Sequence, residues 1–358
     1  MTKIEFVSHK KNINELVNLF EISFGFKTTK EFWRWKYLRN PYTQLRPEVI
    51  VIKEGRDIIG ARPLLFTDFC INNSIIKTAQ PCDTMVHVDH RRKGLFYKMN
   101  DYAIDHYTKE GLKCFYNFPN EKSRSGYLKQ GWRIVSKTES LFYPLNIKKL
   151  VNKVIKKENI SSMTSLIYKY IFMKSQRPSD KNNVMIKTYL KYPKSINKLK
   201  SNKISHKFDI NKNESYFIWR FDHNPIHSYQ YIVAFKEDRI CGYTIISKQK
   251  QRDNTIHGKI VDYYIENKNE SIFIELMKES MIKLSDTDII IIWVFSNNIY
   301  KQLLINKLFF KSPFSFPYNK MINDNYLVVR KLNDFDREKI DIWDKNRWNI
   351  KLGNTDTI

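Results

Sequence analysis

Three basic residues and a glycine stand where a strand-like run gives way to a helix-like one, in VHVDHRRKGLFYKMNDYAIDHY at residues 86–107. A helix N-terminus carries unsatisfied backbone N–H groups and about half a positive charge, so it attracts anions. Gly94 lets the backbone come close to a phosphate, and Arg91, Arg92 and Lys93 add positive charge around it. The spacing therefore predicts a phosphate or pyrophosphate site at this turn.

A second group of polar and aromatic residues follows in NEKSRSGYLKQGW, residues 120–132. Asn120 and Tyr127 are seven residues apart, and the pair Gly131-Trp132 comes directly after them. Taken alone, this pattern is typical of a helix that ends at a glycine and buries its tyrosine. Its order and distance after the basic turn favour a functional interpretation.

Together these residues resemble two motifs of the GNAT acetyltransferase superfamily. Arg91-x-x-Gly94 after a strand is similar to motif A, which holds the pyrophosphate of acetyl-CoA, although Phe96 stands where the motif has a third small residue. Asn120, Tyr127 and Gly131-Trp132 resemble motif B. The resemblance implies acetyl-CoA as cosubstrate and no metal, with a cofactor site made of Thr84, Met85, Val86, Arg91, Arg92, Lys93, Gly94, Leu95, Phe96 and Asn120.

Acetyl transfer to an amine needs a base for the amine, a donor for the oxyanion and an acid for the departing thiolate. The resemblance implies that a backbone N–H of residues 84–86 serves the oxyanion and that Tyr127 is the acid. For the base, Asp83 and His87 lie four residues apart on one predicted strand, hence on one face. We prefer Asp83, because His87 could instead pair with Asp89 as a structural contact.

The chain repeats one segment. WKYLRNP at 35–41 and WRFDHNP at 219–225 share Trp, a basic residue, an aromatic residue and Asn-Pro, and each precedes two apolar strands around a charged turn. The boxes are 184 residues apart, and the matching Gly60 and Gly242 are 182 apart. Self-similarity at this spacing predicts two copies of one domain. The expected fold class is α/β (an α+β mixed sheet), with two tandem domains that resemble GNAT acyl-CoA N-acyltransferases.

The predicted segments are an N-terminal GNAT domain with the acetyl-CoA site at 1–145, a basic, partly helical connector at 146–203, a degenerate GNAT-like domain at 204–335 and a tail at 336–358. In the second copy, the matching strand is followed by Glu266-Asn267-Lys268-Asn269-Glu270 instead of a basic turn. Its two acids would repel a pyrophosphate. We therefore expect one cofactor site, in the first domain.

The net charge of +25 suits a polyanionic partner. The segment 146–203 holds 15 Lys and Arg residues against two acids, and 147–157 has apolar residues on one helical face and lysines on the others. Such a helix packs between two domains or lies on an anionic membrane. We favour packing, because two domains need an interface, with only weak attraction of the lysines to a membrane and no nucleic-acid partner.

The remaining composition indicates a cytoplasmic protein. The N-terminus has no apolar signal segment, and the most apolar run, 289–295, is too short to span a bilayer. The four cysteines have neither disulfide-scaffold density nor metal-ligand spacing.

Three function classes remain open. The preferred one is acetyl-CoA-dependent N-acetylation of a small-molecule amine, such as an amino sugar or a nucleotide-linked sugar, in a surface-polysaccharide or secondary-metabolite pathway. A Fem-type aminoacyl-tRNA-dependent peptidyl transferase would share the tandem fold and the basic charge, but it would not need the Arg-x-x-Gly turn. A non-catalytic module that binds RNA or a membrane would rest on the charge alone.

Overall fold

The computed structural model describes residues 2–43, 47–146, 149, 183–199, 207–295, 298–308, 310, 325–335 and 340–356. The basic helix predicted at 147–157 lies outside these residues, apart from Lys149. The chain groups into two compact units: unit 1 takes Met1–Lys137, Ile204–Ile226 and Asn325–Ile350, and unit 2 takes Thr138–Lys203, His227–Asp324 and Lys351–Ile358. The units thus differ from the predicted segments, because 204–226 and 325–350 group with the N-terminal part of the chain.

Unit 1 carries one complete sheet and part of a second. The complete sheet has the order β1-β2-β3-β6 and is antiparallel throughout. The other part has the order β10-β4-β5-β7-β15, in which only β5 and β7 are parallel. The strands are β1 (Thr2–Ser8), β2 (Glu48–Glu54), β3 (Asp57–Arg62), β4 (Leu64–Ile71), β5 (Ser74–Pro81), β6 (Met85–Val86), β7 (Cys114–Asn117), β10 (Asp209–Ile210) and β15 (Asn325–Lys331).

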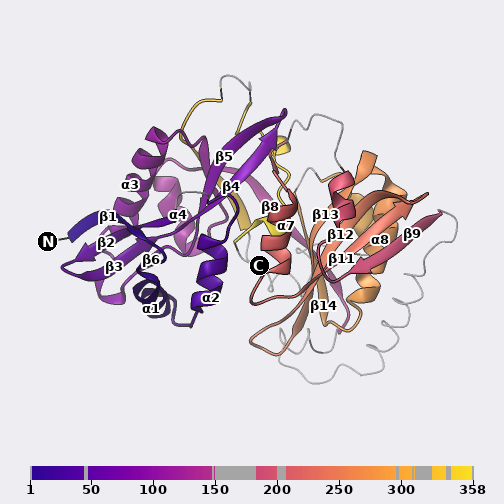
Figure 1. Ribbon diagram of the computed structural model, residues 1–358, viewed down its shortest axis with the longest axis horizontal. Coiled ribbons are helices and arrows are strands. Elements are labelled where there is room, and N and C mark those ends of the chain that lie inside the picture. The colour runs from indigo at the N-terminus through magenta and orange to yellow at the C-terminus, as the bar shows by residue number, and fades with distance from the viewer. Residues whose placement is uncertain are drawn as a thin grey trace. The chain divides into compact units, whose positions relative to one another are not determined.

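Helices cover both faces of the β1-β2-β3-β6 sheet. Figure 1 shows α1 and α3 on opposite sides of these strands. Helix α1 buries Ile13, Leu16, Leu19 and Phe20, the side that its apolar spacing predicts. The helical segments of unit 1 are α1 (Ile13–Phe24), α2 (Lys30–Trp33), the π-turn η1 (Arg34–Leu38), the 3₁₀ turn η2 (Val88–His90), α3 (Leu95–Lys109), α4 (Glu121–Lys129), α7 (Glu214–Phe217), the π-turn η5 (Ile218–Asp222) and the 3₁₀ turn η8 (Lys345–Arg347).

Unit 2 carries strands in the order β8-β14-β13-β12-β11-β9, with β13 and β14 parallel and the other pairs antiparallel. Its core lies between this sheet and α8, where Phe273, Leu276 and Met277 are buried against Ile260 and Ile292. The elements are β8 (Arg133–Pro144, in unit 2 from Thr138), β9 (Val184–Tyr189), η4 (Lys194–Lys198), β11 (Tyr229–Lys236), β12 (Arg239–Lys250), β13 (Ile256–Ile265), η6 (Glu266–Lys268), α8 (Glu270–Lys283), β14 (Ile289–Phe295), α9 (Lys301–Asn306) and η9 (Leu352–Asn354).

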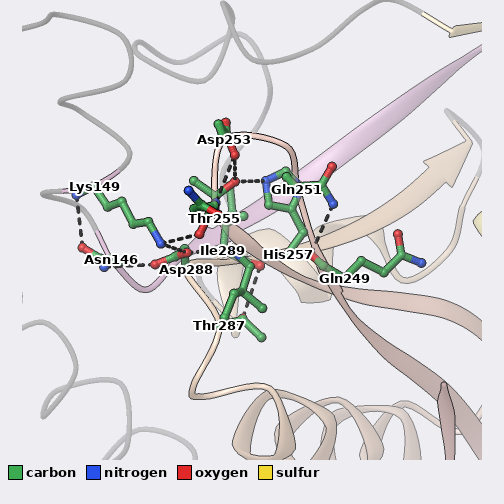
Figure 2. Close-up of polar contacts among 12 residues, drawn as sticks. Asn146, Lys149, Gln249, Gln251, Asp253, Thr255, His257, Thr287, Asp288 and Ile289 are labelled. Carbon is green, nitrogen blue, oxygen red and sulfur yellow. Dashed lines mark hydrogen bonds and ion pairs between the residues drawn. The ribbon is translucent and has the colours of Figure 1, made fainter. Parts of the chain in front are cut away.

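A polar network fixes one end of the unit 2 sheet. Asp288, just before β14, accepts from Asn146 Nδ2 at 3.0 Å and pairs with Lys149 Nζ at 2.8 Å (Figure 2). In the turn between β12 and β13, Asp253 Oδ1 accepts from the backbone N–H of Thr255 at 3.0 Å. These bonds hold the end of β8, the β12–β13 turn and the start of β14 together, and they satisfy a carboxylate that is largely buried.

The two copies of the repeat exchange a strand. In the first copy β7 is followed along the chain by β8, and in the second β14 is followed by β15. Residues 138–144 of β8 pair with β14 in unit 2, whereas β15 pairs with β7 in unit 1. Each copy's sheet is therefore completed by a strand from the other copy. This exchange explains why neither compact unit is one continuous stretch of the chain.

The repeated Trp-Asn-Pro boxes form the same local structure. Trp35 and Trp219 both lie in π-turns, a rare conformation, which makes the repeat structural as well as sequential. Asn40 Oδ1 accepts from the N–H of Tyr42 at 3.0 Å, and Asn224 Oδ1 accepts from the N–H of Ile226 at 2.9 Å. The side chain therefore shapes the turn at each Asn-Pro in the same way.

The two boxes also meet each other inside unit 1. Trp35 Nε1 donates to the carbonyl of Trp219 at 2.6 Å, and Trp219 Nε1 donates to the carbonyl of Trp35 at 2.7 Å. The rings stack with centroids 5.6 Å apart, and Trp35 is fully buried. Each indole thus satisfies a buried carbonyl of the other copy, which relates the two boxes by a local twofold arrangement.

Trp219→Phe should lower the free energy of unfolding by about 2–4 kcal/mol, because it leaves a buried carbonyl without its donor and removes buried volume. Trp35→Phe should cost about the same, since the contact is reciprocal. Trp343→Phe, at a half-buried position in the same unit, is the control and should cost about 1 kcal/mol or less. Denaturant unfolding measures all three, and a Trp219 variant as stable as the control would contradict the assignment.

Candidate active site

The candidate site starts where a long two-stranded ladder breaks. β4 pairs with β5 and β3 pairs with β6, but the two ladders are separated at Pro63, which has no N–H, and at Asp83, whose φ is 44°. β5 lies parallel to β7 at Thr78 and Ala79, whereas β6 belongs to the other sheet. The segment that runs from β5 into β6 and its neighbour β7 therefore part toward their carboxyl ends. This is the edge at which α/β sheets bind ligands.

The basic turn leads from this break into α3. Gly94 is the N-cap with a left-handed φ of 76°, a Cβ there would meet no atom within 4 Å, and no side chain caps the helix. A Ser or Asp cap would occupy the first N–H groups of α3, so the glycine leaves them for an anion. Arg91, Arg92 and Lys93 are exposed beside it. The structure thus brings the predicted loop residues together at a helix N-terminus.

Arg91 is held in place by α1. Its Nη2 donates to the carbonyl of Ser23 at 2.6 Å, and the Ser23 hydroxyl donates to the carbonyl of Val86 at 3.2 Å. The carbonyl end of α1 attracts the guanidinium. Strand β6 and the basic turn are therefore both anchored to one helix end, which orients the turn relative to residues 84–86.

Helix α4 contributes Asn120 and Tyr127. Asn120 is the N-cap, and its Oδ1 accepts from the N–H of Ser123 at 3.0 Å. Tyr127 is buried, and its ring meets Phe96 of α3 edge to face at 5.3 Å and Trp132 at 4.7 Å. The structure therefore places Tyr127 against the first turn of α3, whereas Asn120 already serves its own helix.

The sequence predicts that Asp83 and His87 share one strand, and this prediction is wrong. Strand β6 covers only Met85–Val86, and the backbone of Asp83 is left-handed. Its Oδ2 accepts from Lys36 Nζ at 2.8 Å and from the Tyr37 hydroxyl at 2.5 Å. The Lys36 side chain is almost fully buried, whereas 19% of the Asp83 side-chain surface is exposed. His87 Nδ1 stands 3.6 Å from Asp89 Oδ2, the structural contact that the sequence left open.

Sequence reasoning missed Lys36, Tyr37 and Arg62. The first two belong to the repeated box, which the sequence shows, but their approach to Asp83 depends on the tertiary fold. Arg62, at the end of β3, is fully buried and donates to Thr84 Oγ1 at 3.2 Å. A basic residue inside an apolar strand was the one available indication.

His9 lies next to this region and is buried. Its Nδ1 accepts from Trp33 Nε1 at 3.1 Å, and its ring stacks on Tyr37 with centroids 5.0 Å apart. Burial lowers the pKa of His9 from its ordinary 6.5 to about 3. The imidazole is therefore neutral at physiological pH and supports Tyr37, which in turn donates to Asp83.

Among the described residues, no three His, Cys, Asp or Glu side chains gather in a way that could hold a metal ion. No helix in the described part of the chain is long and apolar enough to cross a membrane.

Comparison with protein-family models matches residues 7–135 to the acetyltransferase (GNAT) domain. This range contains the parted strands, the basic turn and Tyr127. Residues 7–135 are a GNAT acetyltransferase domain. The chain is therefore an acyltransferase, and its GNAT domain takes an acyl-CoA as cosubstrate and an amine as acceptor. A comparison with curated proteins finds no match.

Solved structures share the fold over most of the chain. A GCN5-related N-acetyltransferase from Anabaena variabilis is 13% identical with a TM-score of 0.64, covering 92% of this chain and 73% of that one. A probable N-acyltransferase from Enterococcus faecalis is 8% identical with a TM-score of 0.65, at 93% and 73% coverage. A tandem GNAT protein from the clavulanic acid biosynthesis pathway is 11% identical with a TM-score of 0.60, at 93% and 99% coverage. The mixed α/β fold thus continues beyond the GNAT domain into the second copy.

The second copy keeps the strands but changes the residues around them. Gly60 pairs with Val86 and Gly242 pairs with Ile265, so Thr84 corresponds in register to Tyr263. Lys351 Nζ donates to the Tyr263 carbonyl, and residues 352–355 are buried beside β13. The C-terminal segment of the chain therefore packs where the first copy presents its candidate site.

The helix that follows also differs between the copies. The N-cap of α8 is Asn269, whose side chain accepts from the N–H of Ile272 at 3.1 Å. Glu266, just before it, pairs with Arg239 at 2.7 Å. A capped helix end with an acid beside it is a poorer anion site than the uncapped start of α3.

His9 should make the stability depend on pH. Its pKa in the folded protein is about 3, below the 6.5 of the unfolded chain, so its contribution is complete above about pH 6.5 and is lost as the pH falls toward 3. The loss approaches about 1.4 kcal/mol per pH unit for one proton. His9→Gln should remove this part of the slope in urea unfolding measured at several pH values.

His223→Gln, which removes an imidazole from an exposed position in the same unit, is the matched control. An unchanged slope in the His9 variant would show that the buried imidazole is protonated in the folded state.

Proposed function

We propose that this protein is an acetyl-CoA-dependent N-acetyltransferase, and that the acetyl-CoA site lies in unit 1 between the parted strands and the start of α3. The observation that carries the proposal is the uncapped N-terminus of α3, with three exposed cations, beside strands that diverge at Asp83. Helix N–H groups and Arg91, Arg92 and Lys93 would hold the pyrophosphate. Residues 84–86 and Leu95 and Phe96 would line the rest of the cosubstrate.

The proposed reaction is transfer of the acetyl group from the thioester to the amine. The amine nitrogen attacks the thioester carbon, a backbone N–H of residues 84–86 receives the oxyanion, and the C–S bond breaks with its electron pair on sulfur. The sulfur takes a proton from the Tyr127 hydroxyl, and Asp83 takes the amine proton directly or through one water. The products are an amide and CoA.

Asp83 is arranged for the role of base. Lys36 and Tyr37 both bind its Oδ2, and within the described residues no partner is found at Oδ1. One oxygen therefore fixes the carboxylate while the other is left to accept a proton. Lys36 is almost fully buried, so its position, and that of the carboxylate oxygen it binds, is well defined.

The second copy supports a site in the first copy alone. Its α8 is capped by a side chain, an acid precedes it, and the C-terminal segment is buried against Tyr263. Its part in the protein is then structural, since it supplies the strand β15 that completes the sheet of the catalytic unit.

For the acceptor, we propose a small amine such as an amino sugar or a nucleotide-linked sugar, acetylated in the cytoplasm. The high positive charge favours an anionic acceptor. The structural likeness to a tandem GNAT protein of clavulanic acid biosynthesis supports a place in secondary metabolism or in a surface-polysaccharide pathway.

Acetyl-CoA should bind with a stoichiometry of one per chain in isothermal titration. Arg91→Glu should weaken this binding at least about 100-fold, because it puts a like charge beside the pyrophosphate. Arg56→Glu changes the net charge equally at an exposed turn of the same unit and should leave the affinity near that of the unmodified protein. Two sites per chain would refute the asymmetry between the copies.

Tyr127→Phe should lower kcat by about 100-fold with little change in KM for acetyl-CoA, because only the leaving thiolate loses its proton donor. Asp83→Asn should also lower kcat. Tyr102→Phe, on the neighbouring helix α3, is the control for loss of a hydroxyl. Release of free CoA thiol against a panel of amino sugars measures all three, and full turnover by the Tyr127 variant would return this residue to a packing role.

A further inference from the structure

Arg62 is a buried cation without a carboxylate beside it. It is the last residue of β3 and has no exposed surface. Its Nη1 donates to Thr84 Oγ1 at 3.2 Å, its Nη2 donates to Asn100 Oδ1 at 2.5 Å, and its Nε has no partner. No acid lies within 4 Å of its guanidinium in the part of the chain that the structure describes. An arginine stays charged when it is buried, so this charge is opposed by neutral dipoles only.

Two aromatic rings enclose this guanidinium. Its Cζ lies 5.6 Å from the ring centroid of Phe96 and 5.6 Å from that of Tyr127. Phe96 has room because residue 126 is glycine, where a Cβ would come within 3.1 Å of the Phe96 ring. Phe96, which stands where motif A has a small residue, therefore covers the buried charge of Arg62.

The nearest carboxylate in the hydrogen-bond network is two amides away. Asn100 Nδ2 donates to Gln130 Oε1, and Gln130 Nε2 donates to Asp101 Oδ1 at 2.7 Å. The Asn100 oxygen faces the cation, the Gln130 oxygen faces Asn100, and the two amides keep the Asp101 charge at a distance. The positive potential of Arg62 is thereby only partly cancelled at its own position.

We infer that Arg62 is a positioning residue for the leaving group, and that its buried charge stabilises the anion that forms on the CoA sulfur and is shared with Tyr127. The inference rests on the proposed function. Arg62 contacts the strand, the helix and the tyrosine that would surround the thioester, through Thr84, Phe96 and Tyr127. When the C–S bond breaks, the sulfur becomes negatively charged and is attracted by the positive charge of Arg62. The thiolate then provides the negative charge that no carboxylate provides beside Arg62 in the resting protein.

The test uses CoA and acetyl-CoA, so it needs no knowledge of the acceptor. Only CoA can bind as a thiolate, and binding of the thiolate releases a proton. The affinity of the unmodified protein for CoA, divided by that for acetyl-CoA, should therefore rise about tenfold or more between about pH 6.5 and pH 8.5. Arg62→Met, which keeps the volume and removes the charge, should make this ratio independent of pH. Arg62→Lys, which keeps the charge, should restore much of the dependence.

Turnover gives a second measurement with any accepted amine. Arg62→Met should lower kcat by about 100-fold and change KM for acetyl-CoA less than about threefold. Arg62→Lys should recover at least part of the lost kcat. Unfolding of both variants is followed in parallel, since a structural role would lower stability and activity together in both.

The outcomes separate the two proposals. If the unmodified protein binds neither CoA nor acetyl-CoA, the proposed function fails. If it binds both with a ratio that does not change with pH, or if Arg62→Met keeps the pH dependence, the function stands and the role of Arg62 is refuted. Loss of the dependence in Arg62→Met with recovery in Arg62→Lys supports the role.

Discussion

The candidate active site depends on one interruption of backbone pairing. Between β5 and β6 the chain passes through Asp83 in a left-handed conformation, and the facing chain passes through Pro63, which cannot donate to a ladder. Continuous pairing here would keep the strand in line with β7. Because the pairing stops, β6 joins β1, β2 and β3 while β5 stays beside β7. The sheet edge where β6 and β7 part is followed along the chain by the basic turn and the uncapped start of α3. The candidate site therefore depends on this interruption.

The residue at which the strand breaks is also the base that we propose. Asp83 tolerates a left-handed φ better than most residues, because its short polar side chain can bond locally. Lys36 and Tyr37 from η1 hold it there, and the neutral His9 stacks on Tyr37. A strained backbone position is thus held by a partly buried ion pair and by Tyr37, which itself stacks on His9.

The two copies share a fold but differ at the start of the helix that follows the parallel strand pair. Both copies keep the box, the hairpin and the parallel strand pair, because these create the fold. Only the first keeps a glycine cap and a basic turn in front of its helix. The exchange of β8 and β15 makes each sheet depend on the other copy. The second copy, which has no basic turn before its helix, therefore still completes the sheet beside the candidate site of the first copy.

The sequence by itself determined much of this protein. Local patterns predict four features that the structure confirms. They are the buried face of α1, the hairpin at Glu54–Asp57, the strand Ile289–Phe295 and the duplication. The spacing of Arg91, Gly94 and Tyr127 indicated the GNAT family, which the family model confirms. These features are local because a few neighbouring residues set backbone conformation and amphipathicity.

Only the tertiary structure decided the rest. Four features involve residues far apart in the chain. Strand β6 is only two residues long, and Lys36 and Tyr37 bind Asp83. Arg62 lies between Phe96 and Tyr127, and the two copies exchange strands. Such contacts depend on which strand edges remain unpaired and which side chains find room, as Phe96 does over Gly126. Pairing and packing are settled by the whole fold at once, because each buried polar group must find its partner there.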